Sequence, residues 1–143
     1  MGARGAPKFR QLFHTTDLAL QIFGHSLEEI YENAGAAITA TLTDRRYLRR
    51  KETREITLKA PDREALLVEW LNRLLYLFDV EGFLGREFRV RELSPEKMVV
   101  KARGDIYDPA RHPGGTAIKA ATYHRLEITD QNGGWQAKVI LDL

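Results

Sequence analysis

The chain has 143 residues, and its 43% hydrophobic and 29% charged residues are ordinary for one globular domain with room for a core. The formal net charge of +2 excludes a polybasic protein, and the lack of cysteine excludes disulfides, thiol catalysis and thiolate metal sites. No apolar run approaches the ~20 residues that a membrane span needs, and the first six residues lack the apolar core of a signal peptide, so we expect a soluble cytoplasmic protein.

The amino-terminal part predicts a short tail followed by a strand. Residues 1–8 are small and basic, which favours a flexible tail, and we expect residues 9–143 to form a single domain. The motif His14-Thr15-Thr16-Asp17 opens the first strand, and the apolar part of this strand, residues 18–23, ends at Gly24. His14 and Asp17 would lie on opposite faces of a regular strand unless the two threonines bend the chain.

A helix follows, and its start is marked by a capping box. The Ser26 hydroxyl can accept a hydrogen bond from the amide of Glu29, whose carboxylate can reach back toward the helix start. The apolar residues that follow have helical spacing, and the pattern runs to about Thr43-Asp44. They are Leu27, Ile30, Tyr31, Ala34, Ala37, Ile38 and Leu42.

Residues 45–51 hold five cations, namely Arg45, Arg46, Arg49, Arg50 and Lys51. Such a run suggests a nucleic-acid contact, but one short cluster without interleaved stacking aromatics is weak evidence for it. The favoured interpretation is a solvated loop beside acidic partners.

A strand and a second helix come next. Residues 53–59 predict a strand with Ile56 and Leu58 inward, and Pro61-Asp62 begins the helix with Asp62 as its N-cap. The apolar stripe of this helix is too wide for a surface helix, so a sheet must cover most of it. It comprises Leu66, Leu67, Trp70, Leu71, Leu74, Leu75 and Phe78.

The rest of the chain predicts strands. Phe88 and Val90 point inward, as do Met98, Val100 and Ala102 beyond a turn at Ser94-Pro95. Residues 118–129 alternate, which would place one set of side chains on one face: Ile118, Ala120, Thr122, His124, Leu126 and Ile128. An Asn-Gly turn within residues 130–134 then predicts a hairpin to the last strand, residues 135–143.

The elements therefore run β-α-β-α and then several further strands. This order predicts the α+β class. We expect a single two-layer domain in which two helices pack on one antiparallel or mixed sheet.

Acidic groups near both ends of the domain suggest a metal site. Asp142 stands beside the free carboxylate of Leu143, and strand alternation turns it away from the core, while Asp17 opens the first strand. If these groups meet, they repel unless a cation lies among them, and oxygen ligands suit Ca²⁺, Mg²⁺ or Mn²⁺. Alternatively, both aspartates are ordinary strand-end residues in water.

No motif for an enzyme is evident. The four histidines lack zinc-ligand spacing, and we expect His124 to be a hydrogen-bonded core residue. The sequence has no nucleophile motif, phosphate-binding loop or dinucleotide fingerprint.

Five motifs together resemble the archease family over residues 9–143. They are His14-Thr-Thr-Asp17, Ser26-Leu-Glu-Glu-Ile-Tyr-Glu-Asn-Ala34, Leu67-Val-Glu-Trp-Leu-Asn-Arg-Leu-Leu-Tyr-Leu-Phe78, Ile118-Lys-Ala-Ala-Thr-Tyr-His124 and Val139-Ile-Leu-Asp-Leu143. The resemblance implies a non-enzymatic activator of the RtcB-type RNA ligase, which joins tRNA exon halves. Such an activator promotes guanylylation of the ligase histidine and multiple turnover. The alternative is a general chaperone or an RNA-binding module that acts through residues 45–51.

The resemblance also implies site residues. By position, Asp17, Asp142 and the terminal oxygens of Leu143 match the family's divalent metal site, and Asp44 is a candidate third acidic ligand. We expect Ca²⁺ as the bound ion, with Mg²⁺ or Mn²⁺ as alternatives. His14 and Lys119 match the ligase-activating surface. One departure is Thr16, where the family more commonly has alanine.

Overall fold

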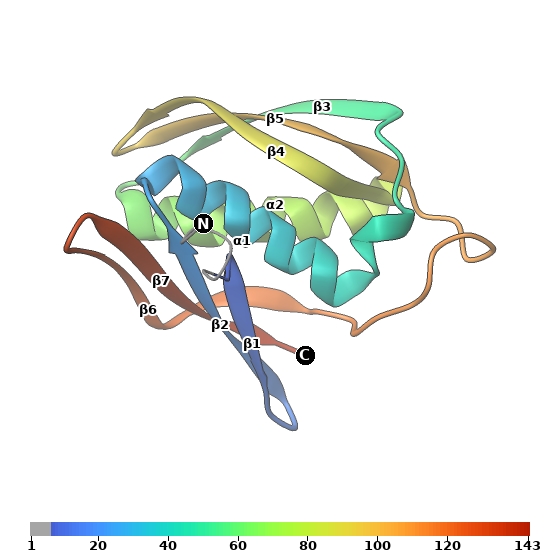
Figure 1. Ribbon diagram of the computed structural model, residues 1–143, viewed down its shortest axis with the longest axis horizontal. Coiled ribbons are helices and arrows are strands. Elements are labelled where there is room, and N and C mark those ends of the chain that lie inside the picture. Colours follow the sequence, from blue (N-terminus) through green and yellow to red (C-terminus); the bar gives the residue numbers. More distant parts are fainter. Residues whose placement is uncertain (1–6) are drawn as a thin grey trace.

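The computed structural model describes residues 7–143, so most of the tail predicted for residues 1–8 lies outside the described residues. Two sheets enclose two helices (Figure 1). The elements are β1 (Phe9–Phe13), β2 (Asp17–Gly24), α1 (Leu27–Leu42), the 3-10 helix η2 (Arg45–Tyr47), β3 (Glu52–Lys59), α2 (Arg63–Glu81), β4 (Phe83–Ser94), β5 (Lys97–Ile106), β6 (Ala120–Gln131) and β7 (Gly134–Asp142).

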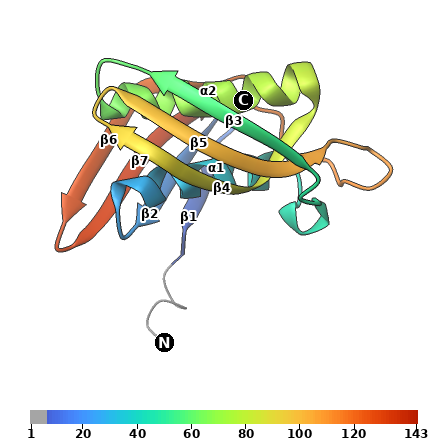
Figure 2. The same cartoon turned by 90° about the horizontal axis from the view of Figure 1, so that it is seen from above.

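The α+β class is confirmed, but the single sheet and the two layers were wrong. The first sheet has the order β1-β2-β7-β6, the second has the order β3-β5-β4, and every neighbouring pair is antiparallel. The helices lie between the two sheets, and the view from above shows the strands of both sheets over and under them (Figure 2). The apolar stripe of α2 is wide because this helix packs against β6 on one side and against β3, β4 and β5 on the other.

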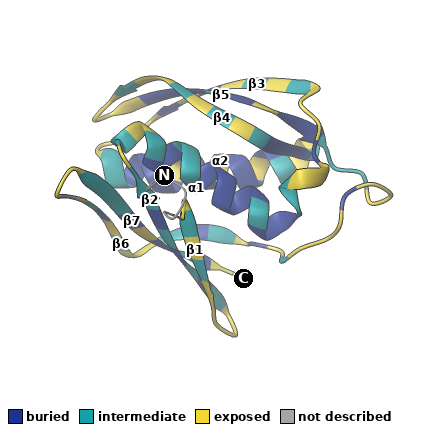
Figure 3. Cartoon of the chain, viewed as in Figure 1, coloured by how far each residue is buried: buried dark blue, intermediate teal, exposed yellow. Residues whose placement is uncertain are grey.

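One core fills the space between the sheets. Figure 3 shows the buried residues on the helices and on the strand faces that meet them. Trp70 is fully buried there, its indole N–H donates to the carbonyl of Tyr31 (2.8 Å), and its ring meets Phe88 edge-on at 5.6 Å. An aromatic side chain of this size buries about 150–250 Å² and contributes strongly to core stability.

Both predicted helix starts are confirmed. The Ser26 hydroxyl accepts from the amide of Glu29 (3.1 Å), and the Glu29 carboxylate accepts from the amide of His25, one residue before the predicted position. Asp62 caps α2 by accepting from the amide of Ala65 (2.8 Å). These caps satisfy backbone donors that a helix start leaves unpaired.

Two strands differ from the prediction. The strand predicted at residues 18–23 is confirmed as β2, but β1, which pairs with β2 across a turn at residues 14–16, was not predicted. In β6 the pairing with β7 is irregular between Thr122 and Glu127, and Arg125 has a positive φ of 53°. This irregularity changes which side chains of β6 face the core. His124 is therefore exposed and is not the core histidine that the alternation predicts.

No helix within residues 7–143 combines the length and the apolar character that crossing a membrane requires.

Candidate functional site

The structure brings Asp17 and Asp142 together. Asp17 begins β2, Asp142 ends β7, and the two residues are direct partners in the register of these strands. The Leu143 amide donates to the carbonyl of Thr16 (3.1 Å), and the His14 amide donates to the carbonyl of Asp17 (2.8 Å). This pattern makes Asp17 and Asp142 a pair without backbone hydrogen bonds between them, the type in which the Cα atoms lie only about 4.5 Å apart.

Both side chains leave the core face of the sheet. Their neighbours Leu18 and Leu141 are fully buried, whereas Asp17 is half-buried and Asp142 is exposed. Like charges directly opposite each other destabilise a sheet. Two unit charges 4 Å apart repel by about 1 kcal/mol in bulk water and about 4 kcal/mol at an effective dielectric constant near 20. Both aspartates therefore project from the outer face of the sheet at the same end of the two strands.

Leu143 lies beside this pair. The Leu143 amide is bonded to the hairpin turn through Thr16, and its side chain is half-buried. The terminus is thus held at the edge of the pair. Carboxylate oxygens are the ligands that hard divalent ions prefer, and Ca²⁺ accepts the most of them.

His14 and Lys119 border the same pair. The backbone amide of His14 donates to Asp17, and that of Lys119 donates to the carbonyl of Asp142 (2.8 Å). Both side chains are exposed. The end of the first sheet therefore presents two carboxylates, the terminus, an imidazole and an ammonium group.

Asp44 is placed differently. Its carboxylate caps η2 by accepting from the amide of Arg46 (3.0 Å) and pairs with the Arg46 guanidinium at 2.6 Å. Hydrogen bonds from the Arg46 side chain and amide lower the pKa of Asp44 below its ordinary value. In the described part of the chain, no three His, Asp or Glu side chains gather in a way that could hold a metal ion, so Asp44 does not join Asp17 and Asp142 there.

Residues 45–51 are bonded within the protein. Arg49 pairs with Asp105 (3.2 Å), Arg50 pairs with Glu87 (3.0 Å), and the Arg45 guanidinium donates to the carbonyl of Arg86 (3.0 Å). Together with the contact of Arg46 described above, these bonds engage four of the five cations. The interpretation as a loop beside acidic partners is confirmed.

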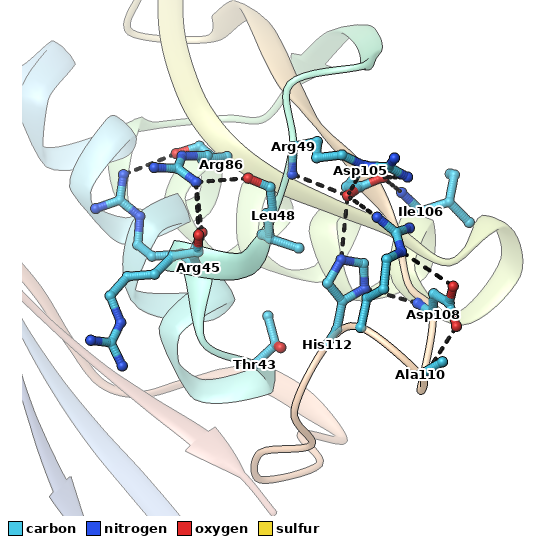
Figure 4. A network of polar contacts seen from close by, with 12 residues as sticks. Thr43, Arg45, Leu48, Arg49, Arg86, Asp105, Ile106, Asp108, Ala110 and His112 are labelled. Atoms are coloured by element: carbon cyan, nitrogen blue, oxygen red, sulfur yellow. Dashed lines mark hydrogen bonds and ion pairs between the residues drawn. The ribbon is translucent and has the colours of Figure 1, made fainter.

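Asp105 is the centre of a network that the sequence did not predict (Figure 4). This carboxylate is buried and accepts from the amides of Arg49 (3.0 Å) and Ile106 (2.9 Å). The His112 Nδ1 accepts from the Asp108 amide, so Nε2 carries the proton and donates to Asp105 (3.3 Å). No spacing rule connects these residues, which explains why they were missed.

The network holds the pKa of Asp105 far below its ordinary value. Burial by itself would raise this pKa, but hydrogen bonds from the amide and guanidinium of Arg49 and from the Ile106 amide outweigh it. The bonded carboxylate ties the loop at residues 107–119 to the segment that follows α1. Further along the loop, the Thr43 hydroxyl donates to the carbonyl of Pro113 (2.7 Å), and the Thr116 amide donates to the carbonyl of Thr41 (2.8 Å).

This anchored loop ends at Lys119, next to Asp142. Gly115 lies so close to the end of α1 that a Cβ atom there would collide with the carbonyl oxygen of Thr41. The loop therefore fixes Lys119 beside the acidic pair.

A hollow of about 610 Å³ lies along the outer face of the first sheet. Ala19 and Ile140 lie one step further along the strands on the face that carries Asp17 and Asp142, and Leu12, which is 52% exposed, lines the same hollow. Arg125, the residue with the positive φ, also contributes to its wall. An exposed apolar surface next to a charged rim is typical of a protein–protein contact.

Comparisons with known proteins agree on one family. The family described as "Archease protein family (MTH1598/TM1083)" matches residues 9–143. A protein archease of Methanosarcina barkeri is 41% identical over 140 residues, which cover 95% of this chain and 96% of that protein. A protein archease of Methanopyrus kandleri is 33% identical over 138 residues, which cover 94% of this chain and 99% of that protein.

Solved structures give the same result. The solution structure of Methanobacterium thermoautotrophicum protein 1598 superposes with a TM-score of 0.82 at 32% identity, and the match covers 95% of this chain and 99% of that one. The crystal structure of an archease from Thermotoga maritima, described as a "possible chaperone", has a TM-score of 0.65 at 23% identity and covers 94% of this chain and 96% of that one, a likeness that shows the fold alone. The family model matches nearly the whole chain, and a relative of similar length is 41% identical to it. The chain therefore belongs to the archease family.

Proposed function

We propose that this protein is a non-enzymatic, cytoplasmic activator of an RtcB-type RNA ligase. It promotes guanylylation of the ligase histidine and restores multiple turnover, and the ligase links it indirectly to tRNA exon halves. Membership of the archease family supports this proposal. The observation that carries it is the register pair Asp17 and Asp142 at the chain terminus, with His14 and Lys119 bonded to the same two residues.

We propose that a divalent ion binds at the acidic tip, the end of the first sheet that carries Asp17, Asp142 and Leu143. Asp17, Asp142 and the terminal carboxylate of Leu143 hold the ion, with Ca²⁺ preferred and Mg²⁺ or Mn²⁺ as alternatives. The ion supplies positive charge that offsets the repulsion of the carboxylates and fixes the terminus. Asp44 could join only by leaving Arg46, so the proposal rests on the other three groups.

The tip and the neighbouring hollow have different roles in the contact with the ligase. The hollow offers apolar area around Leu12, Ala19 and Ile140, which favours association with another protein surface. The tip then enters the mouth of the ligase active site, where Lys119 can contact a carboxylate or a nucleotide phosphate.

Multiple-turnover ligation by the cognate ligase tests this proposal, with the wild-type protein and Asp142→Asn compared. Asp130→Asn is a matched control, because Asp130 is an exposed aspartate at the opposite end of the β6–β7 hairpin. We expect stimulation by the wild type and the control, and a loss of at least about tenfold with Asp142→Asn, which corresponds to about 1.4 kcal/mol. Full stimulation by Asp142→Asn would contradict the assigned site, and no stimulation by the wild type would contradict the assigned partner.

A general chaperone role is the second candidate, and the exposed apolar hollow favours it. A chaperone of this kind would suppress aggregation of an unrelated unfolded protein, and Asp142→Asn would do so as well as the wild type. A chaperone or RNA-binding role of residues 45–51 receives less support, because four of their five cations are bonded within the chain.

A further inference from the structure

A second charged surface lies on the outer face of the sheet β3-β5-β4, on the other side of the helices from the acidic tip (Figure 1). On this face Arg89 of β4 is the direct register partner of Lys101 of β5, and Lys59 of β3 is the partner of Lys97. Like charges directly opposite each other destabilise a sheet. The sequence therefore maintains two unfavourable cationic pairs on one face.

Carboxylates on this face only partly offset the cations. Glu87 is shared between Arg50 (3.0 Å) and Arg103 (3.7 Å), and Glu55 lies opposite Lys101 in the register. Among the described residues, neither Arg89, Arg91 nor Lys101 forms an ion pair with any of these carboxylates. Their charge is therefore directed to solvent.

These cations surround a hollow of about 370 Å³. It is lined by Arg89, Arg91, Lys101 and Arg103, together with Glu87 and Phe88. Three of its four cations are arginines, whose planar guanidinium groups bind phosphate with two hydrogen bonds and stack on bases. The bulge of β4 between Val90 and Glu92 adds Arg91 to this wall outside the regular pairing.

We infer that this hollow binds the phosphate backbone of single-stranded RNA. The chemistry is charge complementarity between successive phosphates and four cations, of which Arg103 would exchange its contact with Glu87 for a phosphate, so binding is tolerant of sequence. The four cations of the hollow lie outside residues 45–51, of which only Arg50 reaches its wall, through Glu87. The hollow also lies on a different sheet from the acidic tip, which repels RNA. The inference does not depend on the ligase, because the binding partner is RNA alone.

The test is fluorescence anisotropy of a labelled single-stranded RNA, titrated with the full chain at 50 and 200 mM salt without ligase. Four phosphate contacts predict a slope of log K against log salt near −3, and hence about a 50-fold loss of affinity between the two salt concentrations. The double variant Arg89→Gln/Lys101→Gln should halve this slope, which leaves about a 7-fold loss. Arg89 is exposed, Lys101 is half-buried, and the two side chains repel each other, so the variant should fold at least as well as the wild type.

The control is Arg46→Gln/Lys138→Gln, which removes the same charge from exposed positions elsewhere. We expect it to keep the wild-type affinity and slope to within about twofold. The inference would be overturned if the control lost as much affinity as Arg89→Gln/Lys101→Gln, since net charge alone would then explain binding. It would also be overturned if Arg89→Gln/Lys101→Gln kept its RNA affinity and instead formed oligomers, because the cations would then serve to protect the edge strand β4 from pairing.

Discussion

At the scale of single residues, we expect the two facing aspartates to lower the stability of the metal-free protein. Asp17 and Asp142 face each other across β2 and β7. Asp142→Asn removes the repulsion, so we expect the metal-free variant to gain up to about 1 kcal/mol in free energy of unfolding. Thermal unfolding in the presence of a chelator measures this gain.

Added Ca²⁺ should reverse the order of the two proteins. Binding to the folded state raises the Tm of the wild type, whereas Asp142→Asn has lost a ligand and should not respond. A Tm of Asp142→Asn that rises with Ca²⁺ as steeply as that of the wild type would contradict the assigned ligands.

Asp105 should make stability depend on pH at the acid end. Its pKa is lowered in the folded protein, so its contribution is fully present above the unfolded value near 3.8 and is lost as pH falls toward the folded value. We expect Asp105→Asn to cost about 2–4 kcal/mol at neutral pH, because buried charge-assisted hydrogen bonds are lost. Urea unfolding between pH 3 and 7 should show a flatter pH dependence for this variant, and an equally steep one would contradict the assignment.

Residue-scale prediction from the sequence succeeded where the signal was local. The caps at Ser26 and Asp62 follow from neighbouring residues, and both formed as predicted. The pairing of Asp17 with Asp142 joins opposite ends of the chain, so the residues left it as one of two alternatives and the resemblance to the archease family favoured it. Asp105 and His112 gave no signal, because their role depends on a tertiary hydrogen bond.

At the scale of elements, the loop at residues 107–119 determines where Lys119 lies. Gly115→Ala would push the loop away from the end of α1, because the added Cβ collides with the Thr41 carbonyl. We expect a loss of about 1–3 kcal/mol in stability, by analogy with overpacked sites, and weaker stimulation of ligation.

Gly114→Ala is the matched control for that loop. No heavy atom lies within 4 Å of the position its Cβ would take, so we expect wild-type stability and stimulation. Chemical denaturation and multiple-turnover ligation of both variants test this pair. Equal behaviour of Gly114→Ala and Gly115→Ala would contradict the role given to the loop.

Strand β6 shows where the alternation of apolar and polar residues fails to predict which side chains face the core. The pattern of residues 118–129 is regular in the sequence, yet the register shifts between Thr122 and Glu127 and Arg125 adopts a positive φ. Arginine gives no warning of this conformation, as glycine or asparagine would. The exposure of His124 could therefore not be predicted.

At the scale of the whole molecule, the sequence predicted both helices and most strands, but neither β1 nor the division of the strands into two sheets. The wide stripe of α2 required cover, and one sheet was the simplest arrangement that could supply it. The structure supplies cover from two sides, with β6 below and β4 above in the view of Figure 1. This division matters for function, because it places the acidic tip and the basic face β3-β5-β4 on different sheets.

The chain terminus provides a test at this scale. Adding a few residues after Leu143 removes the free carboxylate from the tip but leaves the pairing of β7 with β2 and β6 intact. We expect a folded protein of nearly unchanged Tm with chelator present and weaker Ca²⁺ binding by calorimetry. Unchanged Ca²⁺ affinity of the extended protein would show that the terminus is not a ligand.

The most direct test of the central claim is the rate at which labelled GMP is transferred to the histidine of the cognate RtcB-type ligase. It should be measured with the wild-type protein, with Asp17→Asn/Asp142→Asn, and with the control Asp130→Asn. The account predicts faster transfer with the wild type and the control and no acceleration with the double variant. Equal acceleration by the double variant would contradict the acidic tip as the activating site.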